Sequence, residues 1–343
     1  MAKITMSRGK FNGVSAVANQ QGVIVTLAID PRGSLKKALA KAKGSEVSDA
    51  EVIEFKSLVA EVLTPHTSAI LLDPIYGRRP STLRAKTCGL LLTYESSADE
   101  VAGKGRLPEV FSDWSVWRLK KAAGADAVKV CLYYDPDDAA EINTLKQAFV
   151  ERVGAECRAN DIAFFLEPIC YSDTIGDEQS MAFARVKPHK VTKYMREFPQ
   201  PQYGVDVLMG EVPVNVRYIA GSTANTEVLT AYTREEAKRH LRAAAAEAQK
   251  PFMYLSAGVT YEVFCETLEL AGEAGTPFSG ALCGRAMWQG GIPEYGRGGA
   301  QALRTWLNRA GVEGLQVLNA VMARGAKPWW DFYGGKENID IAG

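Results

Sequence analysis

Eight short apolar runs, spread along the chain and separated by helix-like stretches, constrain the fold more than any other feature. They cover residues 23–30, 69–73, 89–95, 127–135, 164–171, 207–214, 252–259 and 280–288. Each run is almost continuously hydrophobic, as expected for a parallel strand that is covered on both faces. The stretches 51–63, 141–160 and 233–250 have the spacing of amphipathic helices. The pattern therefore predicts alternating strands and helices.

Eight strands alternating with helices in a chain of 343 residues predict a single (β/α)8 TIM barrel in the α/β class. A doubly wound sheet is the main alternative, but the glycine-rich turn G-x-G-x-x-G that would hold a nucleotide follows none of the runs. We predict one barrel domain over residues 1–343, with a core at about residues 20–320, an N-terminal extension and an aromatic, then polar, C-terminal tail. The tail is expected to pack on the barrel or on another subunit.

Charge and cysteine use narrow the class of partner. Lys plus Arg and Asp plus Glu each number 40, so no net charge attracts nucleic acid or an anionic membrane. The six cysteines form no C-x-x-C pair, which suits a reduced cytosol. The N-terminal segment lacks the apolar region of a signal peptide, and no stretch has the length of a membrane span. We expect a cytoplasmic protein without a nucleic-acid or membrane partner.

Polar side chains interrupt the later part of several apolar runs, where the active site of a barrel gathers. These residues are Asp30, Arg32, Lys129, Glu167, Glu211, Ser256 and Arg285. A buried Lys or Glu costs roughly several kcal/mol unless it is paired. Lys129 and Glu167, on neighbouring runs, therefore predict either a structural ion pair or a catalytic pair.

The last two runs end in the segments SAGV and CGRAMWQGG, which contain Gly258, Gly284 and Arg285. Loops after strands 7 and 8 of a barrel frequently bind phosphate. Glycine lets backbone N–H groups approach the oxygens, and arginine adds a forked charge. The alternative is that these segments are only tight turns and that Arg285 forms an ion pair with a surface carboxylate. Both motifs stand on the expected strands, which favours a phosphate site.

A metal, a cofactor and a serine nucleophile are not expected. The chain has three histidines, and His66 and His240 lie outside the upper loops of the predicted barrel. A histidine-based metal cluster therefore has too few ligands. Ser256 lacks the G-x-S-x-G turn of a serine hydrolase.

Several segments, in order along the chain, carry a family resemblance. They are TLAIDPRGSLKK, AILLDPIYG, GADAVKVCLYYDPDD, FFLEPICY, ARVKPHKV, DVLMGEVPVNVRY, YTREEA, YLSAGV and LCGRAMW. They closely resemble class I, metal-independent tagatose-1,6-bisphosphate aldolases over about residues 20–320. The resemblance implies a cofactor-free barrel that cleaves a ketohexose bisphosphate into dihydroxyacetone phosphate and glyceraldehyde 3-phosphate through a Schiff base. It also implies a homodimer.

The resemblance assigns roles to residues of this chain. Glu167 matches the carboxylate that moves the proton of the C4 hydroxyl, and Lys129 matches a second lysine that holds substrate oxygens. Pro31 departs from the family, which commonly has Gln there. The resemblance and the polar pattern together predict these substrate-binding residues: Asp30, Arg32, Glu211, Ser256, Gly258, Gly284 and Arg285.

The largest departure lies in the sixth run. The family segment resembles D-V-L-K-V-E-V-P-V, whereas this chain has D-V-L-M-G-E-V-P-V. Met209 therefore stands at the position of the Schiff-base lysine, and Gly210 replaces its neighbour. Methionine fills the space of a lysine stem but has no amine, so no imine can form at this position. Without the resemblance, Met209 would be taken as a flexible core residue.

Three explanations of Met209 compete. In the first, the chain is an altered aldolase in which a Lys-to-Met change keeps substrate binding and stops the chemistry. In the second, it is a relative that performs another lyase or isomerase reaction on sugar phosphates with Lys129 or Glu167. In the third, it is a non-catalytic sugar-phosphate sensor. Lys129 as a relocated nucleophile is a minor hypothesis. Gly210 is expected to give room for a different substrate or backbone path.

Overall fold

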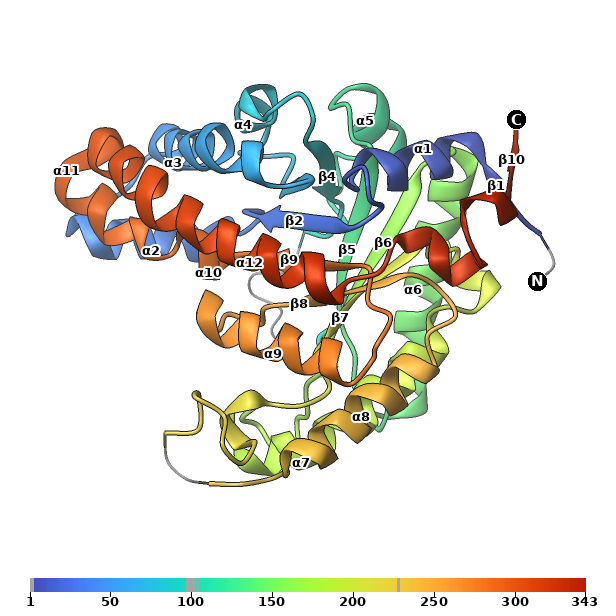
Figure 1. The fold of residues 1–343 in the computed structure, drawn as a ribbon. Coiled ribbons are helices and arrows are strands. Elements are labelled where there is room, and N and C mark those ends of the chain that lie inside the picture. Colours follow the sequence, from blue (N-terminus) through green and yellow to red (C-terminus); the bar gives the residue numbers. More distant parts are fainter. Residues whose placement is uncertain (1–2, 97–102, 104, 227–228) are drawn as a thin grey trace.

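A computed structural model describes residues 3–96, 103, 105–226 and 229–343. Eight parallel strands close into a barrel in chain order, and helices surround it (Figure 1). The barrel strands are β2 (Ile24–Ala28), β3 (Ala69–Leu72), β4 (Gly89–Thr93), β5 (Ala127–Tyr133), β6 (Ala163–Ile169), β7 (Val207–Glu211), β8 (Phe252–Leu255) and β9 (Gly280–Cys283). Each coincides with one of the eight apolar runs, so the predicted (β/α)8 barrel is confirmed.

The three stretches with helical spacing form helices. Two of these helices, α3 and α8, begin at capping boxes in which Ser48 pairs with Glu51 and Thr233 with Glu236. The helices outside the terminal segments are α2 (Gly33–Lys43), α3 (Asp49–Leu63), α4 (Arg78–Leu83), α5 (Val116–Lys121), α6 (Ala140–Ala159), α7 (Met181–Glu197), α8 (Arg234–Ala246), α9 (Tyr261–Glu273), α10 (Arg285–Trp288), α11 (Gly291–Trp306) and α12 (Val312–Gly325). None of the helices in the described ranges is long and apolar enough to cross a membrane.

The barrel interior is apolar toward the N-terminal ends of the strands and polar toward their C-terminal ends. On β5, Ala127 packs in the interior core, whereas Lys129, two residues on, faces a cavity. On β6, Phe165 packs in the same core and Glu167 faces the cavity. Successive side chains of a strand point to opposite faces, so residues two apart share the interior. The polar layer therefore lies at the C-terminal ends of the strands, as the sequence predicts.

The chain termini close the opposite end of the barrel. Strand β1 (Ile4–Ser7) pairs in parallel with β10 (Ile339–Ala342), and α1 (Arg8–Ala16) follows β1 (Figure 1). The buried Trp329 ring lies 5.7 Å from the ring of Phe11 and joins the interior core. The aromatic tail thus packs on the barrel itself.

Replacing Trp329 should destabilise the protein. Trp329→Ala is expected to lower the free energy of unfolding by about 3–5 kcal/mol, because the ring is fully buried. Trp329→Phe should cost less than half as much, since the indole N–H has no hydrogen-bond partner in the described chain. Trp117→Ala, at a site that is 57% exposed, should change stability by about 0.5 kcal/mol or less. Urea denaturation followed by far-UV circular dichroism measures all three, and equal losses at the two tryptophans would contradict the packing described.

Candidate active site

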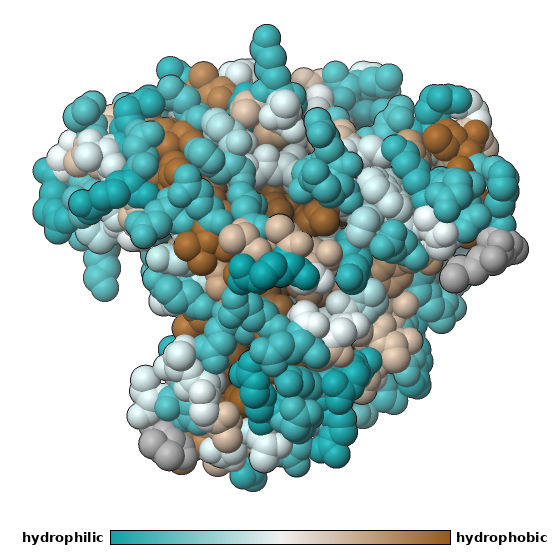
Figure 2. Space-filling view, viewed as in Figure 1, coloured by the Kyte–Doolittle hydropathy of each residue, from teal (hydrophilic) through white to brown (hydrophobic). Residues whose placement is uncertain are grey.

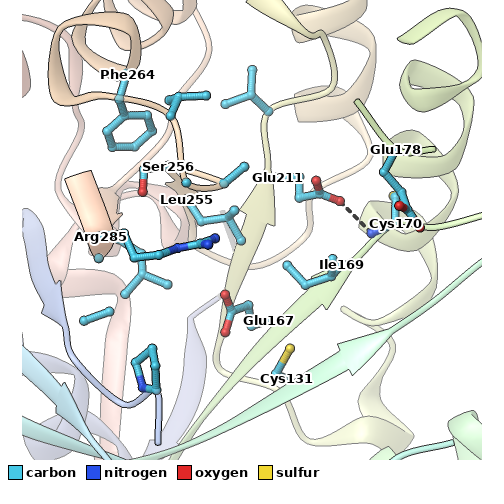
Figure 3. Close-up of a pocket in the computed structure, with 18 of the residues that line it drawn as sticks. Cys131, Glu167, Ile169, Cys170, Glu178, Glu211, Leu255, Ser256, Phe264 and Arg285 are labelled. Carbon is cyan, nitrogen blue, oxygen red and sulfur yellow. Dashed lines mark hydrogen bonds between the residues drawn. The ribbon is translucent and has the colours of Figure 1, made fainter. Parts of the chain in front are cut away.

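A cavity of about 620 Å³ lies at the C-terminal ends of the barrel strands (Figure 3). In Figure 2 the molecular outline is indented below α2 and α11, on the side toward which β2 points in Figure 1. Most of the site residues expected from the sequence line this cavity: Asp30, Lys129, Glu167, Glu211, Ser256, Gly258, Gly284 and Arg285. Arg32 and Met209 are not among the lining residues.

One buried ammonium group organises the floor of the cavity. The Nζ atom of Lys129 lies 2.7 Å from Oε2 of Glu167, 2.8 Å from Oε1 of Glu95 and 3.1 Å from Oδ2 of Asp30. Burial alone lowers the pKa of Lys129, but the attraction of Asp30, Glu167 and Glu95 outweighs it and raises that pKa well above the usual value. Lys129 therefore stays protonated, which makes its amine a poor nucleophile.

Glu167 shares this ammonium with two other carboxylates. Burial raises the pKa of Glu167 to about 7; Lys129 lowers this pKa, and the negative charges of Asp30 and Glu95 raise it. A carboxyl group with this pKa gains and loses a proton near neutral pH, as a general acid and base must. One member of the pair thus has a pKa in the range in which enzymes work, which favours the catalytic interpretation; a catalytic role of the pair stays a prediction.

Another part of the cavity wall, after β8, has N–H donors without an acceptor in the described chain. After β8, Ala257 and Gly258 adopt φ angles of +47° and +78°. Their backbone N–H groups have no acceptor in the described chain. The guanidinium group of Arg285 lies against Gly258, where a Cβ atom would be 2.6 Å from Nη2. Arg285 makes no ion pair within the described residues, so the alternative of a surface carboxylate partner is not observed. Free N–H groups beside an arginine suit an anion.

Met209 lies beneath the cavity. It is fully buried on β7, and the ladder pairs it with Met253 of β8. The apolar floor above it includes Leu255, which packs in the same interior core as Met209 and lines the cavity. Residue 209 therefore lies in the barrel interior next to residues that line the cavity, without lining it itself.

Gly210 faces the other way, toward helix α7. A Cβ atom on Gly210 would lie 3.3 Å from the hydroxyl oxygen of Tyr194 and 3.5 Å from Sδ of Met195. The backbone N–H of Glu211 donates to the Tyr194 hydroxyl at 2.8 Å. The expectation that Gly210 makes room for a substrate is wrong, because successive strand residues face opposite sides and this one contacts the outer helix.

Arg32 is placed away from the cavity wall. Its guanidinium donates to the carbonyl oxygen of Ser96 at 2.7 Å and lies over the ring of Phe111, 4.6 Å from the ring centre. The polar cluster expected after the first strand thus divides: Asp30 points into the cavity and Arg32 contacts the loop after β4. A binding role for Arg32 stays a prediction.

Two functional neighbours were missed from the sequence. Glu95, just after β4, is fully buried against Lys129. Its position at the polar end of an apolar run was the signal for it, as for Glu167. Lys187 on α7 lines the cavity, and its Nζ atom lies 2.9 Å from Oε1 of Glu211. Because Lys187 stands on a helix, the strand pattern contained no sign of it.

Further cations, Arg106 and Arg217, line the same cavity. Arg106 pairs with Glu178 at 2.7 Å, and Glu178 lies across the cavity from Arg285 in Figure 3. Arg217 also lines the cavity, is exposed and has no ion-pair partner in the described chain. No group of three or more potential metal ligands occurs among the described residues. The cavity thus has cations at both ends and an acid–base pair between them.

The chain is similar to known proteins over almost its whole length. The family model described as "DeoC/LacD family aldolase" matches residues 24–290. Tagatose 1,6-diphosphate aldolases of Listeria monocytogenes serotype 4b (strain CLIP80459) and Staphylococcus aureus (strain JH9) are 48% and 47% identical to it. These alignments cover 98% and 95% of this chain, and 98% and 99% of the relatives.

The fold is also similar to that of a solved aldolase. The fructose-bisphosphate aldolase of Plasmodium falciparum superimposes with a TM-score of 0.65 at 15% identity, covering 95% of this chain and 98% of that one. That likeness concerns the barrel alone, whereas the family match and the relatives extend to the sequence. Together with the arrangement of charged groups in the cavity, they lead to one conclusion: the chain belongs to the DeoC/LacD family of aldolases.

Proposed function

We propose that the cavity binds a phosphorylated ketose such as tagatose 1,6-bisphosphate. The observation that carries the proposal is the division of the cavity floor. One part has the unpaired donors of Ala257, Gly258 and Arg285, and the other has Glu167 on the Lys129 ammonium. A phosphate bound by the first group would place the adjoining carbons toward the second. The printed names of the curated relatives support this class of substrate.

The second phosphate of a ketohexose bisphosphate also has a place. Arg106 and Arg217 line the rim of the same cavity, and Arg106 lies on the side away from Arg285. Planar guanidinium groups bind phosphate through paired N–H donors.

The homodimer and the cytoplasmic location expected from the sequence remain predictions.

In the proposed reaction, Glu167 accepts the proton of the C4 hydroxyl while the C3–C4 bond breaks. The electron pair of that bond forms a C2–C3 double bond while the π pair of the C2 carbonyl moves to oxygen, which releases glyceraldehyde 3-phosphate and leaves the enediolate of dihydroxyacetone phosphate. Return of the proton from Glu167 to C3 then gives dihydroxyacetone phosphate. A Schiff base at C2 would accept this pair readily, but residue 209 is Met and provides no amine. We therefore propose that the chain retains substrate binding and that its aldol cleavage is slow.

Restoring the amine should restore imine chemistry. Met209→Lys adds one heavy atom to a side chain that packs in the same interior core as the cavity-lining Leu255, so its Nζ atom should reach the ligand. Incubation with dihydroxyacetone phosphate and borohydride should trap a covalent adduct in the variant and none in the unmodified chain. Cleavage of tagatose 1,6-bisphosphate should rise by about 100-fold or more.

Intact-mass spectrometry and a coupled assay of cleavage make this test. Met209→Leu is the matched control, because it fills the same space without an amine and should stay as slow as the unmodified chain. An adduct on the unmodified chain, mapped by peptide digestion to Lys129 or Lys187, would show that the nucleophile has moved. An absence of adduct in all three proteins would argue for a sensor or another reaction.

The phosphate end can be tested separately. Gly258→Ala should weaken binding of dihydroxyacetone phosphate, because the new methyl group collides with the Arg285 guanidinium. Arg285→Gln should weaken it by about 10- to 100-fold through loss of charge-assisted hydrogen bonds. Gly275→Ala is the matched control: its φ of +72° imposes a similar backbone strain, but nothing lies within 4 Å of the added carbon. Isothermal titration calorimetry measures the three affinities, and equal effects of the two glycine replacements would contradict the assignment.

A further inference from the structure

The cavity contains the parts of an enolisation site that needs no imine. Removing a proton from the carbon beside a carbonyl requires a base, together with a donor that stabilises the negative oxygen. Glu167 and Lys129 stand 2.7 Å apart and both line the cavity. The carbonyl of a ketose whose phosphate lay at Arg285 would face this pair.

We propose that this barrel enolises phosphorylated ketoses directly, with Glu167 as the base and the Lys129 ammonium as the donor to the carbonyl oxygen. The proposal rests on the phosphoketose binding proposed above and adds a reaction that does not depend on residue 209. Dihydroxyacetone phosphate is the simplest substrate of this class.

The step is balanced without a co-reactant. The Glu167 carboxylate takes the proton from the hydroxymethyl carbon, and the C–H electron pair forms a C=C bond to the carbonyl carbon. The carbonyl π pair moves to oxygen, where the Lys129 ammonium donates a hydrogen bond to the resulting enediolate. Return of a proton from Glu167 to the same carbon regenerates the ketose, and in D2O this return delivers deuterium.

Lys129 is held in place for this role. Glu95 is fully buried, and one of its oxygens accepts from Lys129. Its other oxygen has no partner in the described chain. Asp30 holds the ammonium from the side of β2, so two carboxylates other than the base fix the donor. The third N–H group of Lys129 faces Glu167, and it becomes available to the substrate oxygen when Glu167 takes the proton and loses its charge.

Two other groups in the cavity, Glu211 and Cys131, are unsuited to be the base. Glu211 is engaged on both oxygens, by Lys187 at 2.9 Å and by the backbone N–H of Cys170. Burial raises the pKa of the Cys131 thiol well above its usual value, so the thiol stays neutral. Glu167 is the carboxylate that faces the cavity and titrates near neutral pH.

The apolar floor favours the same chemistry. Leu71, Leu255 and Leu282 line the cavity beside the charged pair and pack on the core that contains Met209. An apolar surface keeps water from that side, which strengthens the attraction between the ammonium and the enediolate. A methionine at position 209 therefore suits the proposed reaction, although it excludes an imine.

Proton NMR of dihydroxyacetone phosphate in D2O tests the proposal. The unmodified chain should exchange the hydroxymethyl proton, and Glu167→Gln, purified in the same way, should exchange it at least about 100-fold more slowly. Pretreatment with borohydride and dihydroxyacetone phosphate should leave the exchange of the unmodified chain unchanged, whereas it should inactivate Met209→Lys. Trp117→Ala, remote from the cavity and exposed, should exchange at the unmodified rate.

The pH profile gives an independent readout. Glu167 must be deprotonated to act, so the exchange rate at saturating ligand should rise with pH and level off above about 7. The charged groups around Glu167 are Lys129, Asp30 and Glu95, and the neutral Cys131 thiol lies beside them. Lys129 remains protonated throughout this range, so the profile should show no fall below about pH 9.

The outcomes separate this proposal from the one it rests on. Saturable binding of dihydroxyacetone phosphate by calorimetry, without exchange above the Glu167→Gln level, would overturn the enolisation and leave phosphoketose binding intact. No binding would overturn the proposed function itself. Exchange that borohydride abolishes in the unmodified chain would show an imine on another lysine, and would also reject the proposal.

Discussion

The site depends on one buried ammonium group placed among three carboxylates. Taking Lys129 out of water is costly unless opposite charges compensate for it. Glu167 on β6, together with Asp30 and Glu95 just after β2 and β4, provides these charges. The same contacts fix the lysine in its protonated form and force the carboxylates to compete for it. Burial, together with the negative charges of Asp30 and Glu95, raises the pKa of Glu167, and Lys129 lowers it. The burial that requires these groups to pair therefore also gives Glu167 its acid–base range.

The barrel makes this arrangement possible by stacking layers. Its lower interior is filled by apolar side chains and closed by the aromatic tail, with Trp329 buried against Phe11. That packing leaves the C-terminal ends of the strands free to carry charge, because stability is provided at the other end of the barrel. Residue 209 stands between the two regions, which explains how a methionine fits there without leaving a buried polar group unpaired.

Much of this could be predicted from the sequence. Each apolar run became a strand, and the polar residues late in the runs, such as Lys129 and Ser256, reached the cavity because strand direction and alternation determine their position. Residues outside the strands were less predictable. Arg32 contacts Ser96, and Lys187 reaches the cavity from helix α7. Both contacts depend on how the surrounding segments pack, which the strand pattern does not show. The prediction for Gly210 was wrong because it ignored strand alternation. Since Met209 faces the barrel interior, alternation directs residue 210 toward the outer helix.

Gly210 and its neighbour Met209 are subject to different packing constraints. Residues 209 and 210 are adjacent in the chain but face different environments: Met209 packs inside the barrel, and Gly210 contacts Tyr194 and Met195 outside it. A substitution at one is therefore not required to compensate for a substitution at the other. The two departures that the sequence resemblance implies therefore answer to separate constraints, one in the interior of the barrel and one in the fit of helix α7 against its wall.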